Sequence, residues 1–220
     1  MSCVQASVID VPLAVDWIRR TADSVAARRE HLTQLDRAIG DGDHGANLDR
    51  GFTAVIAALD AEPPQTAGGV LVLAGRSLVS MVGGASGPLY GMALRAMGRS
   101  LDAGSADAQG ISAALSEAFA AIGQLGKAEP GEKTMVDAFG PAVAAFDDAV
   151  RAHRSLADAA TDAARAAARG ADATTAMVAR KGRASQLGER SVGHQDPGAT
   201  STALLFHALA ETVREPAREA

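Results

Sequence analysis

A chain of 220 residues suits one globular domain, and its abundant alanine with only 3% aromatic residues favours closely packed helices over sheets. The net charge of -5 and the dispersed lysines and arginines exclude the basic surface of a nucleic-acid-binding protein, and no apolar run approaches the roughly 20 residues that span a bilayer. Because no leader segment opens the chain and its single cysteine, Cys3, excludes an intrachain disulfide, we expect a cytoplasmic protein that contacts neither membrane nor nucleic acid.

The first informative segment, Leu35–Asn47, places three carboxylates within eight residues. Asp36 ends a helical pattern that begins near Val25, and Asp41 and Asp43 alternate through a glycine-rich turn, so the chain can fold all three toward one point. Such a cluster is unfavourable unless a cation offsets the repulsion, and hard oxygen ligands suit magnesium. The segment therefore predicts a magnesium site.

Other interpretations of this segment differ in how well they fit. Aspartate and glycine also cap helices and form turns, so a purely structural role remains the alternative to a metal site. Gly40, Gly42 and Gly45 have the spacing of a dinucleotide-binding loop, but a helical pattern precedes them where that motif needs a strand. A calcium loop starting at Asp41 would need an acidic ligand at its twelfth position, which is Phe52.

Apolar residues at helical spacing predict three amphipathic helices in the middle of the chain. Their apolar faces are Leu48, Phe52, Val55 and Leu59; Leu115, Phe119 and Ile122; and Phe139, Val143, Phe146 and Val150. Turn-forming segments separate the helices at residues 62–64, 82–88, 128–131 and 182–198. In the second of these, Ser86 precedes Gly87, Pro88 and an apolar run, so we expect Ser86 to cap a helix whose free amides can bind phosphate.

Residues 126–134 approach the spacing of a P-loop, but Glu132 precedes the lysine and no strand comes before, which excludes that motif. The alanine-rich segment 157–169 predicts a thin, closely packed helix. Three cations at 180–183 form either a solvated basic face or, through Arg183, a contact to a diphosphate.

The last helix is predicted to begin at Asp196 and Pro197, since aspartate is a favoured cap and proline a favoured first residue. In total we expect an all-α protein of about eight antiparallel helices, in one domain over residues 1–220, with functional residues in the loops at one end of the bundle or barrel. His44 and His194 are the histidines nearest these loops. Either could accept a phosphoryl group or donate a proton, and we favour hydrogen-bonding roles because neither has an evident activating partner.

Four blocks of the sequence closely resemble DhaL, the L subunit of bacterial dihydroxyacetone kinases, and the matching C-terminal domain of their single-chain relatives. The blocks are LTQLDRAIGDGDHGANLDRGF, GGASGPLYGMAL, GKAEPGEKTMVDA and ARKGRASQLGERSVGHQDPGATS, in the order of the family, and the resemblance runs from about residue 10 to residue 213. It implies an eight-helix barrel that holds ADP or ATP through two Mg²⁺ ions, with Asp36, Asp41 and Asp43 as the metal ligands.

The same resemblance implies which other residues contact the nucleotide. Those that would line the phosphates are His44, Gly45, Ala46, Asn47, Ala85 and Ser86, and those that would enclose the rest are Gly126, Met135, Arg183, Asp196, Pro197 and Gly198. Met135 would pack on the adenine, and Arg183 is the candidate for stabilising charge during transfer. No side chain is expected to act as a covalent nucleophile.

The resemblance also implies an activity that needs partner subunits. Bound ADP would be phosphorylated by a phosphotransferase-system protein, the M subunit, and would pass the phosphoryl group to dihydroxyacetone held on a separate K subunit. We further expect a homodimer. Two alternatives stay open: an ATP-exchanging subunit that serves another keto-sugar or an acyl acceptor, and an ADP-binding regulatory module that contacts a transcription regulator.

Overall fold

The computed structural model describes residues 6–101 and 105–215, so that Cys3 lies outside the described residues. Its α-helices are α1 (Val11–Ile39), α2 (His44–Ala61), α3 (Ala67–Met81), α4 (Ser86–Ser100), α5 (Ala108–Gly126), α6 (Val136–Arg151), α7 (Leu156–Ala173) and α8 (Pro197–Arg214). Two 3₁₀ helices, η1 (Thr174–Ala176) and η2 (Arg183–Ser191), lie between α7 and α8. Two short strands, β1 (Val8–Ile9) and β2 (Ala106–Asp107), pair antiparallel.

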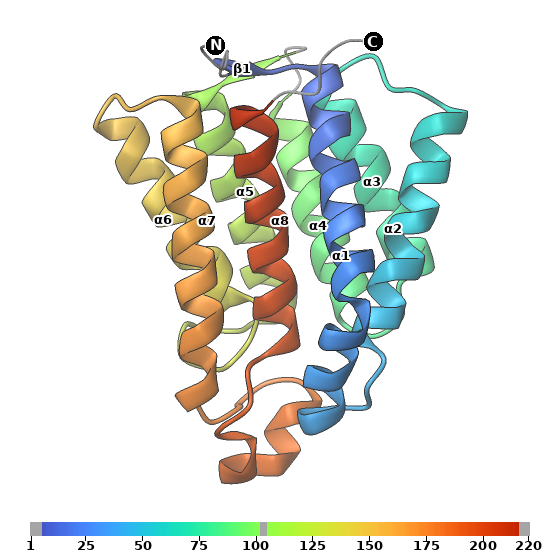
Figure 1. Cartoon of the computed structure of the whole chain (residues 1–220), viewed down its shortest axis with the longest axis vertical. Helices are drawn as coiled ribbons and strands as arrows, with labels where there is room; N and C mark the ends of the chain where they lie inside the picture. Colours follow the sequence, from blue (N-terminus) through green and yellow to red (C-terminus); the bar gives the residue numbers. More distant parts are fainter. Residues whose placement is uncertain (1–5, 102–104, 216–220) are drawn as a thin grey trace.

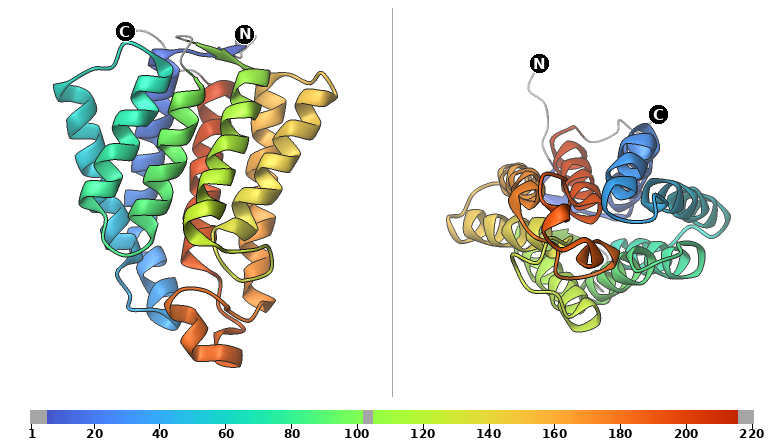
Figure 2. Two further views of the ribbon diagram at one scale, coloured as in Figure 1. Left: turned by 180° about the vertical axis from the view of Figure 1, so that it is seen from behind. Right: turned by 90° about the horizontal axis from the view of Figure 1, so that it is seen from below.

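The helices alternate in direction and form a closed ring, as Figures 1 and 2 show. Each helix packs against the next in the chain, and α8 packs against α1 to close the ring. The β1–β2 pair lies at one end, and the connection that contains η2 lies across the other (Figure 2). The predicted all-α, up-and-down helical barrel is confirmed.

Small residues allow the helices to approach closely around a few large side chains. Trp17, Phe139, Phe146 and Phe206 are almost fully buried, and the indole N–H of Trp17 donates to the Leu205 carbonyl at 2.9 Å, which ties α1 to α8. The buried face of α7 consists almost entirely of alanine, as the sequence predicted. Where α3 and α4 cross, a Cβ on Gly98 would lie 2.4 Å from the Gly68 carbonyl oxygen, so this crossing requires glycine.

Two predicted helix starts are wrong. The first helix begins at Val11 rather than near Val25, because Asp10 caps it by accepting from the Leu13 amide at 3.0 Å. Ser86 is the first residue of α4 and not its cap. The preceding residue, Ala85, already has helical dihedral angles, whereas a capping side chain normally extends from a residue with extended backbone. Within the described residues, no helix combines the length and the hydrophobicity that crossing a membrane requires.

Candidate functional site

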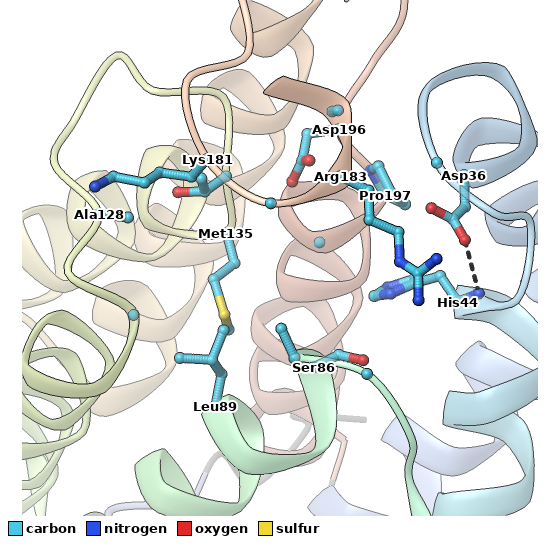
Figure 3. Close-up of a pocket in the computed structure, with 18 of the residues that line it drawn as sticks. Asp36, His44, Ser86, Leu89, Ala128, Met135, Lys181, Arg183, Asp196 and Pro197 are labelled. Carbon is cyan, nitrogen blue, oxygen red and sulfur yellow. Dashed lines mark hydrogen bonds between the residues drawn. The ribbon is translucent and has the colours of Figure 1, made fainter. Parts of the chain in front are cut away.

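The connections at the η2 end of the bundle surround a pocket of about 320 Å³. Its walls come from four connections: α1 to α2, α3 to α4, α5 to α6, and α7 to α8. The lining residues are Asp36, Ile39, Gly40, Asp41, Asp43 and His44; Gly83, Gly84, Ala85, Ser86, Leu89 and Tyr90; Ile122, Gly126, Ala128, Lys133, Thr134, Met135 and Val136; and Lys181, Gly182, Arg183, Ala184, Asp196, Pro197 and Gly198. The loops at one end of the fold thus converge on one cavity (Figure 3).

The three aspartates of the first motif meet at the edge of this pocket. One carboxylate oxygen from each of Asp36, Asp41 and Asp43 lies within 4.8 Å of the others. Asp36 also accepts from the backbone amides of Asp43 (2.8 Å) and His44 (3.1 Å), so it serves as a cap for α2 from the end of α1 (Figure 3). The capping interpretation therefore applies to Asp36, and the magnesium interpretation stays a prediction. An all-oxygen set at this spacing fits Mg²⁺.

Four helices begin at the pocket: α2, α4, α6 and α8. The first turn of a helix leaves backbone N–H groups without helical partners and carries a partial positive charge, which favours phosphate groups. At α4 the loop turns at Gly84, whose φ of 70° lies in the left-handed region, before the chain enters the helix at Ala85 and Ser86. At α8 the helix begins with Pro197 and Gly198. The pocket can therefore accept several anionic oxygens beside a cation site.

The other side of the pocket is apolar. Met135 is 5% exposed and points into the pocket on the same side as Leu89 (Figure 3), with Ile122, Ala128 and Val136 also in the lining. An apolar surface of this kind, which we call the apolar slot, suits a flat ring such as a nucleobase, and methionine adapts readily to aromatic surfaces.

A buried hydrogen-bond network supports the pocket floor. The Tyr90 hydroxyl lies 2.7 Å from Ser201 Oγ and 2.9 Å from Thr202 Oγ1, and Ser201 Oγ lies 2.9 Å from His44 Nε2. Burial raises the pKa of Tyr90 to about 12, so the phenol stays protonated. Burial lowers the pKa of His44, against the opposing effect of Asp36 and Asp43, and favours the neutral ring. This arrangement agrees with a hydrogen-bonding role for His44.

Asp196 is the predicted cap of α8, and the structure confirms that role. Its Oδ2 accepts from the Ala199 amide at 2.7 Å, and its own amide donates to Thr174 Oγ1 at 2.9 Å. Burial raises the pKa of Asp196 to about 7, although the hydrogen bond from the Ala199 amide and the nearby Lys133 act in the opposite direction.

The structure brings most of the predicted nucleotide-contacting residues into the pocket, but not Gly45, Ala46 and Asn47. Gly45 packs on α1 so closely that a Cβ would lie 2.0 Å from the Arg29 carbonyl oxygen, and Asn47 Oδ1 accepts from Arg50 at 2.8 Å. His194 also lies outside the lining.

Lys133 and Tyr90 line the pocket, but the sequence did not single them out. Lys133 is 1% exposed, and its ammonium donates to carbonyls of the α7–α8 connection. Burial lowers the pKa of Lys133, and the negative charge of Asp196 raises it. Because the hydrogen-bond partners of both residues lie 41 or more positions away in sequence, no local pattern reveals them.

Comparison with known proteins gives consistent results. Residues 38–211 match the model of the DAK2 domain family. The chain is 41% identical over 203 residues to the "PEP-dependent dihydroxyacetone kinase 1, ADP-binding subunit DhaL" of Listeria innocua, covering 92% of this chain and 97% of that protein. It is also 41% identical over 202 residues to the "PEP-dependent dihydroxyacetone kinase, ADP-binding subunit DhaL" of Escherichia coli K12, covering 91% and 96%. The crystal structure of the dihydroxyacetone kinase of C. freundii superposes with a TM-score of 0.72 at 27% identity, covering 96% of this chain but only 36% of that longer chain.

Proposed function

Because the chain belongs to the DAK2 domain family, we propose that it is the ADP-binding, phosphoryl-transferring subunit of a dihydroxyacetone kinase. The observation that carries the proposal is one pocket in which an all-oxygen cation site, the N-termini of α2, α4 and α8, and an apolar slot adjoin. These elements match the metal, the phosphates and the base of a nucleotide, in that order along the pocket.

Each wall of the pocket then has a specific part in binding. Asp36, Asp41 and Asp43 hold Mg²⁺, two ions in our proposal, which would neutralise phosphate charge when bound. In the first turn of α2, His44–Asn47, the amides of Gly45 and Ala46 are the ones left for the phosphates, although these residues and Asn47 lie outside the pocket lining. The amides of His44 and Asn47 donate to Asp36 and to the Asp43 carbonyl. Ala85 and Ser86 at α4 also direct their amides toward the phosphates. Met135 packs on the adenine.

The remaining predicted residues enclose the nucleotide from the opposite side. Gly126 borders the apolar slot, and Asp196, Pro197 and Gly198 form the turn into α8. Arg183 reaches into the space between Asp196 and Asp36 (Figure 3), where a guanidinium can stabilise charge on a transferring phosphoryl group. Phosphoryl transfer mainly requires positioning and charge neutralisation, so no protein nucleophile is needed.

The partners follow from the same proposal. A phosphotransferase-system M subunit phosphorylates the bound ADP, and the resulting terminal phosphoryl group passes to a hydroxyl of dihydroxyacetone carried by a K subunit, which regenerates ADP. We propose that the protein works in the cytoplasm as a homodimer. The chain by itself then does not phosphorylate dihydroxyacetone.

The nucleotide content of the purified protein tests the proposal. ADP that stays bound through purification, and that a metal chelator releases, is the expected result. Protein that is empty and exchanges ATP rapidly would instead identify an ATP-dependent subunit. Stable ADP binding without phosphoryl transfer in any mixture with K and M subunits would favour a regulatory module that contacts a transcription regulator.

A further inference from the structure

Lys133 is a lysine whose charged end lies inside the protein. Lys133 is 1% exposed and lies in the connection between α5 and α6, where its backbone has a left-handed φ of 62°. In the part of the chain that the structure describes, its ammonium bonds to backbone carbonyls and forms no ion pair with a carboxylate. Burying an ammonium costs free energy that packing alone would not require, so the bonds that it makes indicate a role in holding other segments in place.

The three acceptors lie at both ends of one loop. Lys133 Nζ donates to the carbonyls of Thr174 (2.7 Å), Met177 (3.3 Å) and His194. We call residues 177–194 the 177–194 loop. Thr174 lies just before this loop, Met177 is its first residue and His194 is its last. One ammonium therefore joins the two ends of the loop. An ammonium has three N–H donors, so the carbonyls leave none free for a phosphate.

The 177–194 loop carries one wall of the pocket. Lys181, Gly182, Arg183 and Ala184 line the cavity from it, and Asp196 follows two residues after its end. Two further bonds fix the loop near its ends: Gly193 N donates to the Thr175 carbonyl at 2.8 Å, and Arg180 N donates to the Glu132 carbonyl at 3.1 Å. Figure 2 shows this connection lying across the end of the ring of helices.

The backbone of Lys133 belongs to the opposite wall. Thr134 and Met135 follow it in the lining of the pocket. Asp137, on α6, holds this segment by accepting from the amides of Gly131 and Thr134. Lys133 therefore connects a wall fixed by α6 to a loop that has little secondary structure apart from η2.

We propose that Lys133 is a positioning residue of the nucleotide site, whose ammonium closes the 177–194 loop and thereby holds Arg183 and the start of α8 over the pocket. This role rests on the proposed nucleotide binding. Lys133 does not touch the nucleotide, and its contribution to affinity passes through the loop.

The test compares Lys133→Met with Lys127→Met. Lys127 is exposed, lies in the same connection with a left-handed φ of 49°, and does not line the pocket, so the same substitution there is a matched control. The dissociation constant of Mg·ADP is measured by calorimetry at a temperature at which circular dichroism shows both variants to be folded. Hydrogen–deuterium exchange of the 177–194 loop is measured without nucleotide.

For Lys133→Met we expect a dissociation constant raised by about 10-fold or more, the usual effect of removing a supporting contact, together with faster exchange in the 177–194 loop and unchanged exchange in α1 to α4. Lys127→Met should change neither. Weaker binding with unchanged exchange in the loop would overturn the proposal in favour of a direct charge effect, and unchanged affinity would overturn it outright.

Two further outcomes are covered. If Lys133→Met does not fold, Lys133→Gln removes the charge and one donor, and it should show the same paired changes to a smaller extent. A Lys133→Gln variant that shows no change in affinity and no change in loop exchange would overturn the proposal. If the unmodified protein binds no nucleotide, the proposed function fails, and the exchange data still decide whether Lys133 holds the loop.

Discussion

The guanidinium of Arg183 lies 2.9 Å from the carboxylate of Asp41 and so connects the 177–194 loop to the turn between α1 and α2. The Arg183 side chain is 69% exposed, and an ion pair in such surroundings contributes little to stability. Both groups belong to the proposed binding site, one as a metal ligand and the other as a phosphate contact. Under this proposal a metal ion and a guanidinium compete for the same carboxylate.

Arg183→Met should change metal and nucleotide binding in opposite directions. Removing a cation beside Asp41 should tighten the binding of Mg²⁺ alone, whereas Mg·ADP should bind about 10-fold more weakly because a charged phosphate contact is lost. Calorimetric titrations with each ligand give both constants. Arg180→Met, at an exposed residue outside the pocket lining, should leave both unchanged. Weaker binding of Mg²⁺ alone to the Arg183 variant would contradict the competition.

Asp41→Ala should abolish magnesium-dependent nucleotide binding and leave the protein folded. Asp41 is exposed and lies in the turn between two helices, so its side chain contributes little to the core. Equilibrium dialysis with and without Mg²⁺, alongside thermal unfolding, measures both properties. Asp60→Ala removes an aspartate that is more exposed than Asp41 and also pairs with an arginine, Arg19, and it should retain binding. Unchanged nucleotide affinity in the Asp41 variant would remove the basis for the metal assignment.

Gly45→Ala should destabilise the fold. An added Cβ would lie 2.0 Å from the Arg29 carbonyl oxygen of α1, which the helices can relieve only by moving apart, at a cost of about 1–3 kcal/mol. Gly123→Ala, inside α5 with no atom near the new Cβ, should instead stabilise the protein by about 0.5–1 kcal/mol. Urea unfolding distinguishes the two. Equal stability of the Gly45 variant and the unmodified protein would show that this residue does not set the α1–α2 distance.

Asp196→Asn should become more stabilising as the pH rises. The pKa of Asp196 is raised from 3.8 to about 7 by burial, so the folded state binds a proton more tightly than the unfolded state, and the unmodified protein loses stability as the pH rises from about 4 to 7. The full effect is at most about 4 kcal/mol, from 1.36 kcal/mol per pKa unit. Asparagine can keep the cap without titrating.

Urea unfolding of the two proteins at pH 5 and pH 8, in chelator and without nucleotide, measures this effect. The free energy of unfolding of Asp196→Asn minus that of the unmodified protein should increase between the two pH values. A constant difference would mean that Asp196 titrates normally.

The sequence predicted those parts of the molecule that depend on neighbouring residues. Apolar spacing identified α2, α5 and α6, and the aspartates of one short turn could be predicted to converge because few conformations separate them. The prediction that Asp196 caps α8 is confirmed. The prediction that Ser86 caps α4 is wrong, because the backbone is already helical at Ala85 and Ser86 is the first residue of the helix.

The parts that could not be predicted depend on distant contacts. Gly45 lies in a motif that suggests phosphate binding, but its packing on Arg29 becomes evident only when α1 and α2 are placed together. The partners of Lys133 lie 41 to 61 residues away, and its role follows from the path of a loop with no repeating pattern. Tyr90 likewise forms its hydrogen bonds with hydroxyl groups of α8, which is distant in sequence.

The β1–β2 pair and the last turn of α8 lie at the end of the barrel opposite the pocket (Figure 1). A polypeptide joined before β1 or after α8 would begin at the end of the barrel away from the loops that line the pocket. The fold is therefore suited to genetic fusion: it can be one module of a longer enzyme, as in the C. freundii kinase chain, or carry a reporter, and keep its pocket open to a partner.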